Sequence, residues 1–240
     1  MRTSQIDRTA GPDRRQAAID IVIYVAAAFA FYGAEAVLDA AGFYPLPSLF
    51  RGGLTLIASL FVVIALQRRH GLGWRELGLC RPDRWWKIPV WGLAVVAITI
   101  IVQLAVAPVL AWLLGAPEPD LSRYDAIVGN LPLFIVSALG AMFTGGFIEE
   151  VIYRGLLIDR LERVLGARRH AAAGAAMLSG VVFGLIHFEW GVGGIVSTAI
   201  MGATLGFMFL AIRRNLWPLI AAHAFLDLIL MLQVYFGMLT

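Results

Sequence analysis

Long apolar runs, separated by short polar segments, occupy most of the chain. A membrane-spanning helix needs about 20 predominantly apolar residues. Seven runs are close to this length, at residues 19–38, 49–66, 88–114, 127–157, 172–188, 195–212 and 216–236. The pattern predicts an all-α, polytopic transmembrane helix bundle of about seven spans, or eight if Pro108 interrupts the third run. We interpret the first run as a retained span, because no small-residue cleavage site precedes the next charge.

Composition agrees with a membrane protein and argues against a soluble one. Hydrophobic residues make up 60% of the 240 positions and charged residues only 15%, whereas a soluble domain is about half apolar and a quarter charged. The expected partner is therefore the lipid bilayer.

Basic residues alternate between the two sets of connections. The N-terminal tail and segments 67–87, 159–170 and 213–214 contain 16 of the 19 Lys and Arg residues. Cytoplasmic loops carry such an excess, so we predict a cytoplasmic N-terminus in a multi-pass protein of the cell membrane, most simply a bacterial inner membrane. This loop pattern also accounts for the net charge of +3 without a nucleic-acid partner.

The stretch "GGFIEEVIYRG" brings three ionisable residues into the fourth apolar run. On a helix, Glu150 and Arg154 form an i,i+4 pair in the favourable order, with the acid first. Glu149 points about 100° away from Glu150. The spacing predicts a structural role for Glu150, neutralised by Arg154, and a chemical role for Glu149. The alternative is a charge cluster near a helix end.

Two later runs also contain ionisable groups. Phe183 and His187 lie four residues apart in the fifth run, and His223 and Asp227 lie four apart in the seventh. Ionisable residues within membrane spans are costly and mark functional cavities by default. We therefore predict that Glu149 and these groups share one polar site.

The residue types suit hydrolysis. A glutamate with a neighbouring histidine can take a proton from water, and a second histidine can stabilise the oxyanion formed when that water attacks a carbonyl. The alternative is a divalent metal such as zinc, held by His187, His223 and Glu149 with one position open. The sequence contains neither GxSxG nor HExxH.

Three motifs carry a family resemblance. The segments "EEVIYR" at 149–154, "FGLIH" at 183–187 and "HAFLD" at 223–227 are similar, in the same order, to the EExxxR, FxxxH and HxxxN/D motifs of the CPBP family. These are the type II CAAX prenyl endopeptidases and bacteriocin-processing intramembrane proteases. The resemblance covers the last four spans, whereas the first three share nothing diagnostic with the family.

The resemblance implies an intramembrane endopeptidase. Glu149 and His187 would activate water, and His223 and Asp227 would stabilise the oxyanion. Prenyl-processing members typically have Asn in place of Asp227, and an ionised Asp has no proton to donate. The supporting positions would be Glu150, Arg154 and Phe183. Family members are described both as metal-independent glutamate proteases and as metalloproteases, and we expect that no cofactor is required.

The chain is thus divided into a cytoplasmic tail at 1–18, three accessory spans at 19–126 with the basic loop 67–87, and a CPBP-like core at 127–240. The fourth run is too long for one crossing, and its tail, "LLIDRLERVLGARR", predicts an amphipathic helix at the membrane surface. We interpret Glu35 and Asp39, four residues apart near the outer border, as a solvated helix end.

Counting about 1.5 Å per residue from the predicted cytoplasmic border gives unequal depths for the site residues. His187 is about 22 Å deep, whereas Glu149 and His223 are about 13 Å and about 10 Å deep. A shared site therefore requires that the fifth helix begins outside the membrane or that the cavity is elongated.

Two other functions stay open: a small transporter or proton relay, and a non-catalytic membrane scaffold or immunity factor. No internal repeat supports a transporter, and the complete set of polar residues argues against a scaffold. For a protease, the expected substrate is a peptide or a membrane protein.

Overall fold

A computed structural model of the chain describes residues 11–43, 52–82 and 84–239. The regular elements in these residues are all helical. Their order is α1 (Arg14–Ala40), α2 (Gly53–Arg69), α3 (Lys87–Leu114), the 3-10 helix η2 (Ser122–Ile127), α4 (Leu131–Phe143), the π-helix η3 (Thr144–Leu157), α5 (Ile158–Leu165), α6 (Ala171–Leu185), the 3-10 helix η4 (Phe188–Trp190), α7 (Gly191–Ala211) and α8 (Leu216–Tyr235). The predicted all-α polytopic bundle is confirmed.

Within the described residues, five helical segments are long and apolar enough to cross a membrane: Arg14–Ala40, Lys87–Leu114, Leu131–Leu165, Phe188–Ala211 and Leu216–Tyr235. Two further helices, α2 with 17 residues and α6 with 15, are shorter. α3 continues through Pro108 as a single helix of 28 residues, so the third run does not divide into two spans.

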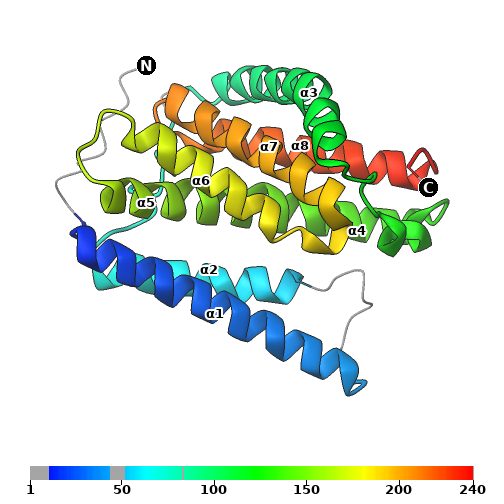
Figure 1. The fold of residues 1–240 in the computed structure, drawn as a ribbon, viewed down its shortest axis with the longest axis horizontal. Coiled ribbons are helices and arrows are strands. Elements are labelled where there is room, and N and C mark those ends of the chain that lie inside the picture. The colour runs from blue at the N-terminus through cyan, green and yellow to red at the C-terminus, as the bar shows by residue number, and fades with distance from the viewer. Residues whose placement is uncertain (1–10, 44–51, 83, 240) are drawn as a thin grey trace.

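The helices form a bundle with α1 and α2 paired along one side and α3 on the opposite side (Figure 1). α1 and α2 pack on each other and reach the rest of the bundle through α5 and the π-helix, while α3 packs on α7 and α8. The segments α4 to α8 lie between these two layers. The predicted core thus occupies the centre of the fold.

α6 and α7 pack closely because small residues line their interface. A Cβ added at Gly184 would lie 2.5 Å from Cβ of Ala199, and one at Gly202 would lie 3.0 Å from Cα of Gly180. Small residues spaced four apart let membrane helices approach closely and gain dispersion contacts. This interface brings the backbone of α7 close to the core of the bundle.

The fourth apolar run differs from its prediction at both ends. The start at residue 127 is wrong: Ile127 ends a separate 3-10 helix, and α4 begins at Leu131, where Asn130 accepts a hydrogen bond from the Leu133 amide. From there the segment Leu131–Leu165 is helical without interruption.

The amphipathic helix predicted at the end of this run is α5, and one of its faces packs against protein. Its residues Ile158 and Arg160 are buried, because α1 and α6 cover α5. Arg160 donates through Nε to Asp20 and through Nη2 to Gln67, at 2.9 and 2.7 Å. His70 also contacts Asp20, at 3.0 Å. The buried face of α5 thus meets protein partners, and this network ties α1 and α2 to the core.

The interpretation of Glu35 as part of a solvated helix end is wrong. Glu35 is buried, and its two carboxylate oxygens accept from the backbone amides of Gly52 and Thr55 at 2.8 and 2.9 Å. α2 begins after Gly52, which offers no side-chain cap. A carboxylate stabilises the N-terminus of a helix, so Glu35 of α1 caps α2 and joins the two helices.

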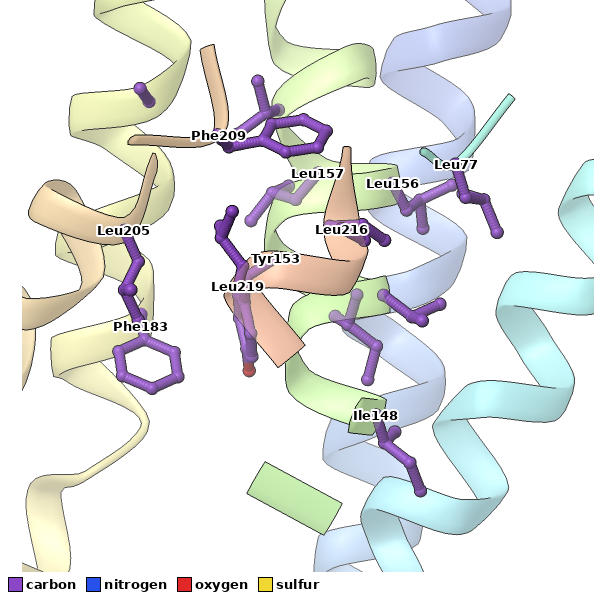
Figure 2. Packing of buried hydrophobic residues seen from close by; sticks show 14 of the residues in the cluster. Leu77, Ile148, Tyr153, Leu156, Leu157, Phe183, Leu205, Phe209, Leu216 and Leu219 are labelled. Carbon is purple, nitrogen blue, oxygen red and sulfur yellow. The ribbon is translucent and has the colours of Figure 1, made fainter. Parts of the chain in front are cut away.

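Apolar side chains cover much of the outer surface. On α3, Ile101, Leu104 and Trp112 are 65%, 75% and 79% exposed. Such exposure is unfavourable in water but favourable against hydrocarbon. The interior has its own apolar cluster, in which Tyr153 and Leu156 of the π-helix meet side chains from several other helices (Figure 2).

Candidate active site

The π-helix Thr144–Leu157 carries the EEVIYR motif and lies at the centre of the bundle. Every residue from Ile148 to Leu157 is buried, with α2, α6 and α8 packed around the segment. π-helices are rare and occur mostly as short insertions, frequently at functional sites. Here one spans 14 residues.

Two glycines bring α8 against this π-helix. A Cβ added at Gly145 would lie 2.5 Å from the Asp227 Oδ2 atom, and one at Gly146 would lie 2.7 Å from the Ala224 Cβ atom. At Gly146 the neighbours include the backbone of Ala224, so only a residue without a side chain fits there, whereas at Gly145 the neighbour is the end of the Asp227 side chain. The pair therefore places the HAFLD segment of α8 directly beside the EEVIYR segment.

Glu150 is the centre of a buried polar chain. Its Oε1 atom accepts from Nη1 of Arg154 at 2.7 Å and from Nδ1 of His223 at 2.7 Å. Arg154 also donates through Nη2 to the Gly202 carbonyl of α7 at 3.2 Å. Glu150 is 0% and Arg154 1% exposed. The predicted Glu150–Arg154 ion pair is formed, and it holds the imidazole of His223.

His223 directs its second nitrogen toward two more carboxylates. Nε2 lies 3.9 Å from Oε2 of Glu149 and 3.7 Å from Oδ1 of Asp227. These distances exceed a hydrogen bond, but they place the three side chains close together. Glu149, His223 and Asp227 are therefore brought together, on the π-helix and α8.

His187 lies just after α6 rather than on it, since the helix ends at Leu185. Its Nδ1 atom lies 2.7 Å from the Phe183 carbonyl oxygen. A carbonyl can only accept, so Nδ1 carries the proton and, in the neutral ring, Nε2 presents a free lone pair. The ring also packs against Trp190, with 5.0 Å between centroids.

Phe183 connects the two histidines. Its ring centroid lies 4.7 Å from that of His187 and 6.0 Å from that of His223. The guanidinium of Arg154 sits over the same ring, 4.8 Å from its centroid. One aromatic ring thus lies against both histidines. No hydrogen bond or ion pair joins His187 to Glu149 in the described residues.

Some polar atoms of the cluster around Glu150 can still form hydrogen bonds. In the part of the chain that the structure describes, Oε2 of Glu150 and Oδ2 of Asp227 are buried without a hydrogen-bond partner. Buried polar atoms of this kind are uncommon and need an explanation. A polar substrate or water entering between the carboxylates would provide one.

The described residues do not form a ready set of ligands for zinc. Among the described residues, no three or more His, Cys, Asp or Glu side chains are grouped so that they could hold a metal ion. His187, His223 and Glu149 are thus not arranged as a metal site, and we assign no chemical step to a metal.

Sequence reasoning missed a polar cluster beside His187. The Tyr32 hydroxyl of α1 donates to Glu189 at 2.7 Å, and Arg123 pairs with the other carboxylate oxygen of Glu189. The Tyr124 and Trp190 rings meet edge to face next to this pair. The available signal was Glu189 itself, an acid two residues after His187. The cluster connects α1 and η2 to the turn that carries His187.

The fold and the polar cluster around Glu150 define a class of protein. It is a polytopic helical membrane protein whose centre contains carboxylates and histidines. Residues 131–229 match the model of the family described as type II CAAX prenyl endopeptidase Rce1-like. The matched range contains all three motifs and confirms the resemblance to the CPBP family. This part of the chain is thus similar to the CAAX protease-like family. No curated protein and no solved structure matches the chain.

Proposed function

We propose that the protein is an intramembrane endopeptidase that hydrolyses a peptide bond with water activated by Glu149 and His187. The observation that carries this proposal is the position of His223. Its Nδ1 is held by Glu150, so its Nε2 faces Glu149 and Asp227. A fixed imidazole between two carboxylates suits proton transfer and oxyanion binding better than it suits a purely structural role.

In the proposed reaction, the Glu149 carboxylate takes a proton from water while the water oxygen forms a bond to the scissile carbonyl carbon. His187, with its proton on Nδ1, accepts a hydrogen bond from the same water through Nε2. The carbonyl oxygen becomes an oxyanion. When the carbon–nitrogen bond breaks, the leaving amine receives the proton from the Glu149 carboxyl group, which restores the carboxylate.

His223 and Asp227 stabilise the oxyanion in this proposal. His223 carries a proton on Nδ1 toward Glu150 and donates a second one from Nε2. Glu150 and Arg154 act as positioning residues, because their ion pair fixes the His223 ring. Phe183 lies between the two imidazoles, and both of them pack against its ring.

The proposed setting is the cell membrane, with the N-terminus on the cytoplasmic side and a peptide or membrane protein as substrate. One end of the bundle is basic, and it contains Arg69, Arg160, Arg163 and Arg214. By the positive-inside rule this end would be cytoplasmic. Bilayer thickness permits the segments Lys87–Leu114 and Leu131–Leu165 to cross fully.

The experiment that tests the proposal uses the purified full-length protein in proteoliposomes. Probes are a farnesylated CAAX peptide and its unmodified form, together with a comparison of new protein termini in cells expressing the wild type or a variant. Glu149→Ala and His187→Ala should each reduce cleavage at least about 100-fold, the scale of lost acid–base catalysis. Exposed residues provide matched controls, Glu118→Gln and His170→Ala, and these should cleave as the wild type does.

Full activity of both Glu149→Ala and His187→Ala would refute the proposal. Activity should be measured with and without chelator, and bound metal should be quantified in the same preparation. If chelator abolished cleavage and zinc restored it, the reaction would depend on a metal. Water activation by Glu149 and His187 alone would then be wrong.

A further inference from the structure

The three residues that follow His187 each contact a side chain from outside the matched range. Phe188, Glu189 and Trp190 form the 3-10 helix η4 between α6 and α7. The side chains that contact them belong to α1 and η2, which precede residue 131, where the family match begins. The candidate active site therefore borders on a part of the chain to which the match gives no role.

Tyr32 of α1 makes two contacts with η4. Its hydroxyl donates to Oε1 of Glu189 at 2.7 Å, and its ring meets the Phe188 ring edge to face, with 5.9 Å between centroids. Nearer the start of α1, Asp20 pairs with Arg160 of α5. α1 is thus attached to the core at two levels, and η4 is one of them.

Two consecutive residues of η2 contact η4 as well. Arg123 pairs with Oε2, the other carboxylate oxygen of Glu189. The Tyr124 and Trp190 rings meet edge to face, with 6.2 Å between centroids. Just before η2, the Asp120 amide donates to the Trp190 carbonyl at 3.0 Å. Because Arg123 and Tyr124 are adjacent in the chain, one short helix sets the positions of both Glu189 and Trp190.

Trp190 connects these contacts to the imidazole of His187. The two rings lie 5.0 Å apart between centroids, and the Trp190 amide donates to the His187 carbonyl at 3.0 Å. A Cβ added at Gly194 would lie 2.2 Å from Cβ of Trp190, so α7 limits the movement of this residue. The imidazole also packs on Phe183. The direction of its Nε2 atom therefore depends on how Trp190 is held.

Positioning explains this cluster better than stability does. The Arg123 and Glu189 side chains are 24% and 27% exposed, and ion pairs open to solvent stabilise a fold little. A misplacement of about 1 Å near the reacting atoms, in contrast, can lower a rate about 100-fold. A small energetic contribution at this turn can thus have a large effect on a reaction.

We propose that Glu189 is a positioning residue for His187 and that Tyr32 and Arg123 act through it. The ion pair and the phenol hold η4 in one orientation. Trp190 then keeps the imidazole in its Nδ1 hydrogen bond to the α6 carbonyl, with Nε2 available to water. The part of His187 in water activation rests on the proposed function, whereas its placement by Glu189 does not.

The first test needs no substrate. NMR of the purified full-length protein with isotopically labelled histidine reports which ring nitrogen carries the proton. The chain has four histidines, and His187→Ala identifies the His187 signals. In the wild type they should show a neutral ring with the proton on Nδ1. In Glu189→Ala they should move toward the average of the two tautomers, because the ring loses its fixed hydrogen bond. Tyr32→Phe should move them in the same direction, but less far.

The second test is cleavage of the peptide probes. Glu189→Ala should lower kcat about 100-fold and change KM little, as expected when a catalytic group is misplaced. Tyr32→Phe removes only the hydroxyl and should lower kcat about fivefold, the scale of one hydrogen bond. Arg123→Lys keeps the positive charge, so it should retain more activity than Arg123→Ala.

The matched control is Glu162→Ala, which breaks another partly exposed ion pair between distant segments, that with Arg214. It should behave as the wild type does in both tests. Unchanged His187 signals in Glu189→Ala would overturn the proposal, even if the melting temperature fell, because Glu189 would then only stabilise the fold. Equal changes in the control would overturn it too.

Failure of the proposed function would look different. If the wild type cleaved no probe, or if kcat stayed normal although the His187 signals moved, the role of His187 in water activation would be wrong. The movement of the signals in Glu189→Ala and Tyr32→Phe would still decide whether Glu189 places the imidazole.

Discussion

The Nδ1 atom of His223 lies 2.7 Å from Oε1 of Glu150, although 73 positions separate the two residues in the chain. The same oxygen accepts from Arg154. One buried carboxylate thus satisfies a cation on its own helix and orients an imidazole on another. The consequences of this arrangement can be measured.

Removing one member of the Glu150–Arg154 pair should destabilise the protein strongly. Glu150→Ala leaves the buried guanidinium of Arg154 without its counter-charge, and such a loss costs about 3–5 kcal/mol. The double variant with Arg154→Ala removes both charges, so it should be more stable than the sum of the single effects indicates. Denaturant unfolding in detergent measures the three free energies.

Glu162→Ala is the control for this cycle, because it breaks a partly exposed pair with Arg214. Its cost should stay below about 1 kcal/mol. Strictly additive effects at Glu150 and Arg154 would contradict the coupling that the structure indicates.

Gly145→Ala should impair activity more than stability. The added methyl group would lie 2.5 Å from Oδ2 of Asp227, and the end of this side chain can move aside at modest cost. Asp227 would then leave its position beside His223, so kcat for peptide cleavage should fall while the melting temperature changes little. Gly140→Ala, in the same helical segment, meets no atom within 4 Å and serves as the control.

Gly146→Ala should have the opposite effect. Its methyl group would lie 2.9 Å from the backbone nitrogen and Cα of Ala224, and a helix backbone cannot move aside alone. α8 must shift as a whole, so the melting temperature should fall by several degrees. If the two glycine variants lose stability equally, the close approach of α8 to the π-helix is misplaced.

Asp227→Asn should retain cleavage, and Asp227→Leu should lose it. An amide donates a hydrogen bond to an oxyanion without needing protonation, whereas a carboxyl group donates only when protonated. The CPBP motif itself accepts Asn or Asp at this position. Rates of peptide cleavage across pH 5 to 9 give the comparison. An Asn variant as inactive as the Leu variant would show that Asp227 acts as a carboxylate on His223.

Cys80 should be a slow nucleophile at neutral pH. Burial raises the pKa of its thiol above the ordinary value, and the thiol donates to the Arg75 carbonyl at 3.6 Å. A raised pKa leaves less thiolate at pH 7, so alkylation by N-ethylmaleimide should accelerate as pH rises through and beyond the ordinary range for a cysteine. The unfolded chain provides the reference profile.

Cys80 is the only cysteine in the sequence, so any modified thiol is that of Cys80. The midpoint of the pH–rate profile separates a pKa effect from simple shielding, which lowers the rate at every pH without moving the midpoint. Coincident midpoints for the folded and unfolded protein would contradict the prediction.

Local patterns in the sequence determined the class of the protein. The length of an apolar run predicts a helix that can enter a membrane, because every backbone polar group must be paired within hydrocarbon. The Glu150–Arg154 pair followed from i,i+4 spacing for the same local reason. The three motifs pointed to a resemblance to CAAX proteases, and the match over residues 131–229 confirms that resemblance.

Only the tertiary structure decided which distant groups meet. Nothing in the spacing of the chain indicates that Glu150 binds His223, that Glu35 caps α2, or that Asp20 pairs with Arg160. These contacts depend on the direction in which each helix presents its side chains and on how closely glycines let helices approach. Both properties arise from packing between segments far apart in sequence. The periodicity of residues within one segment therefore cannot predict them.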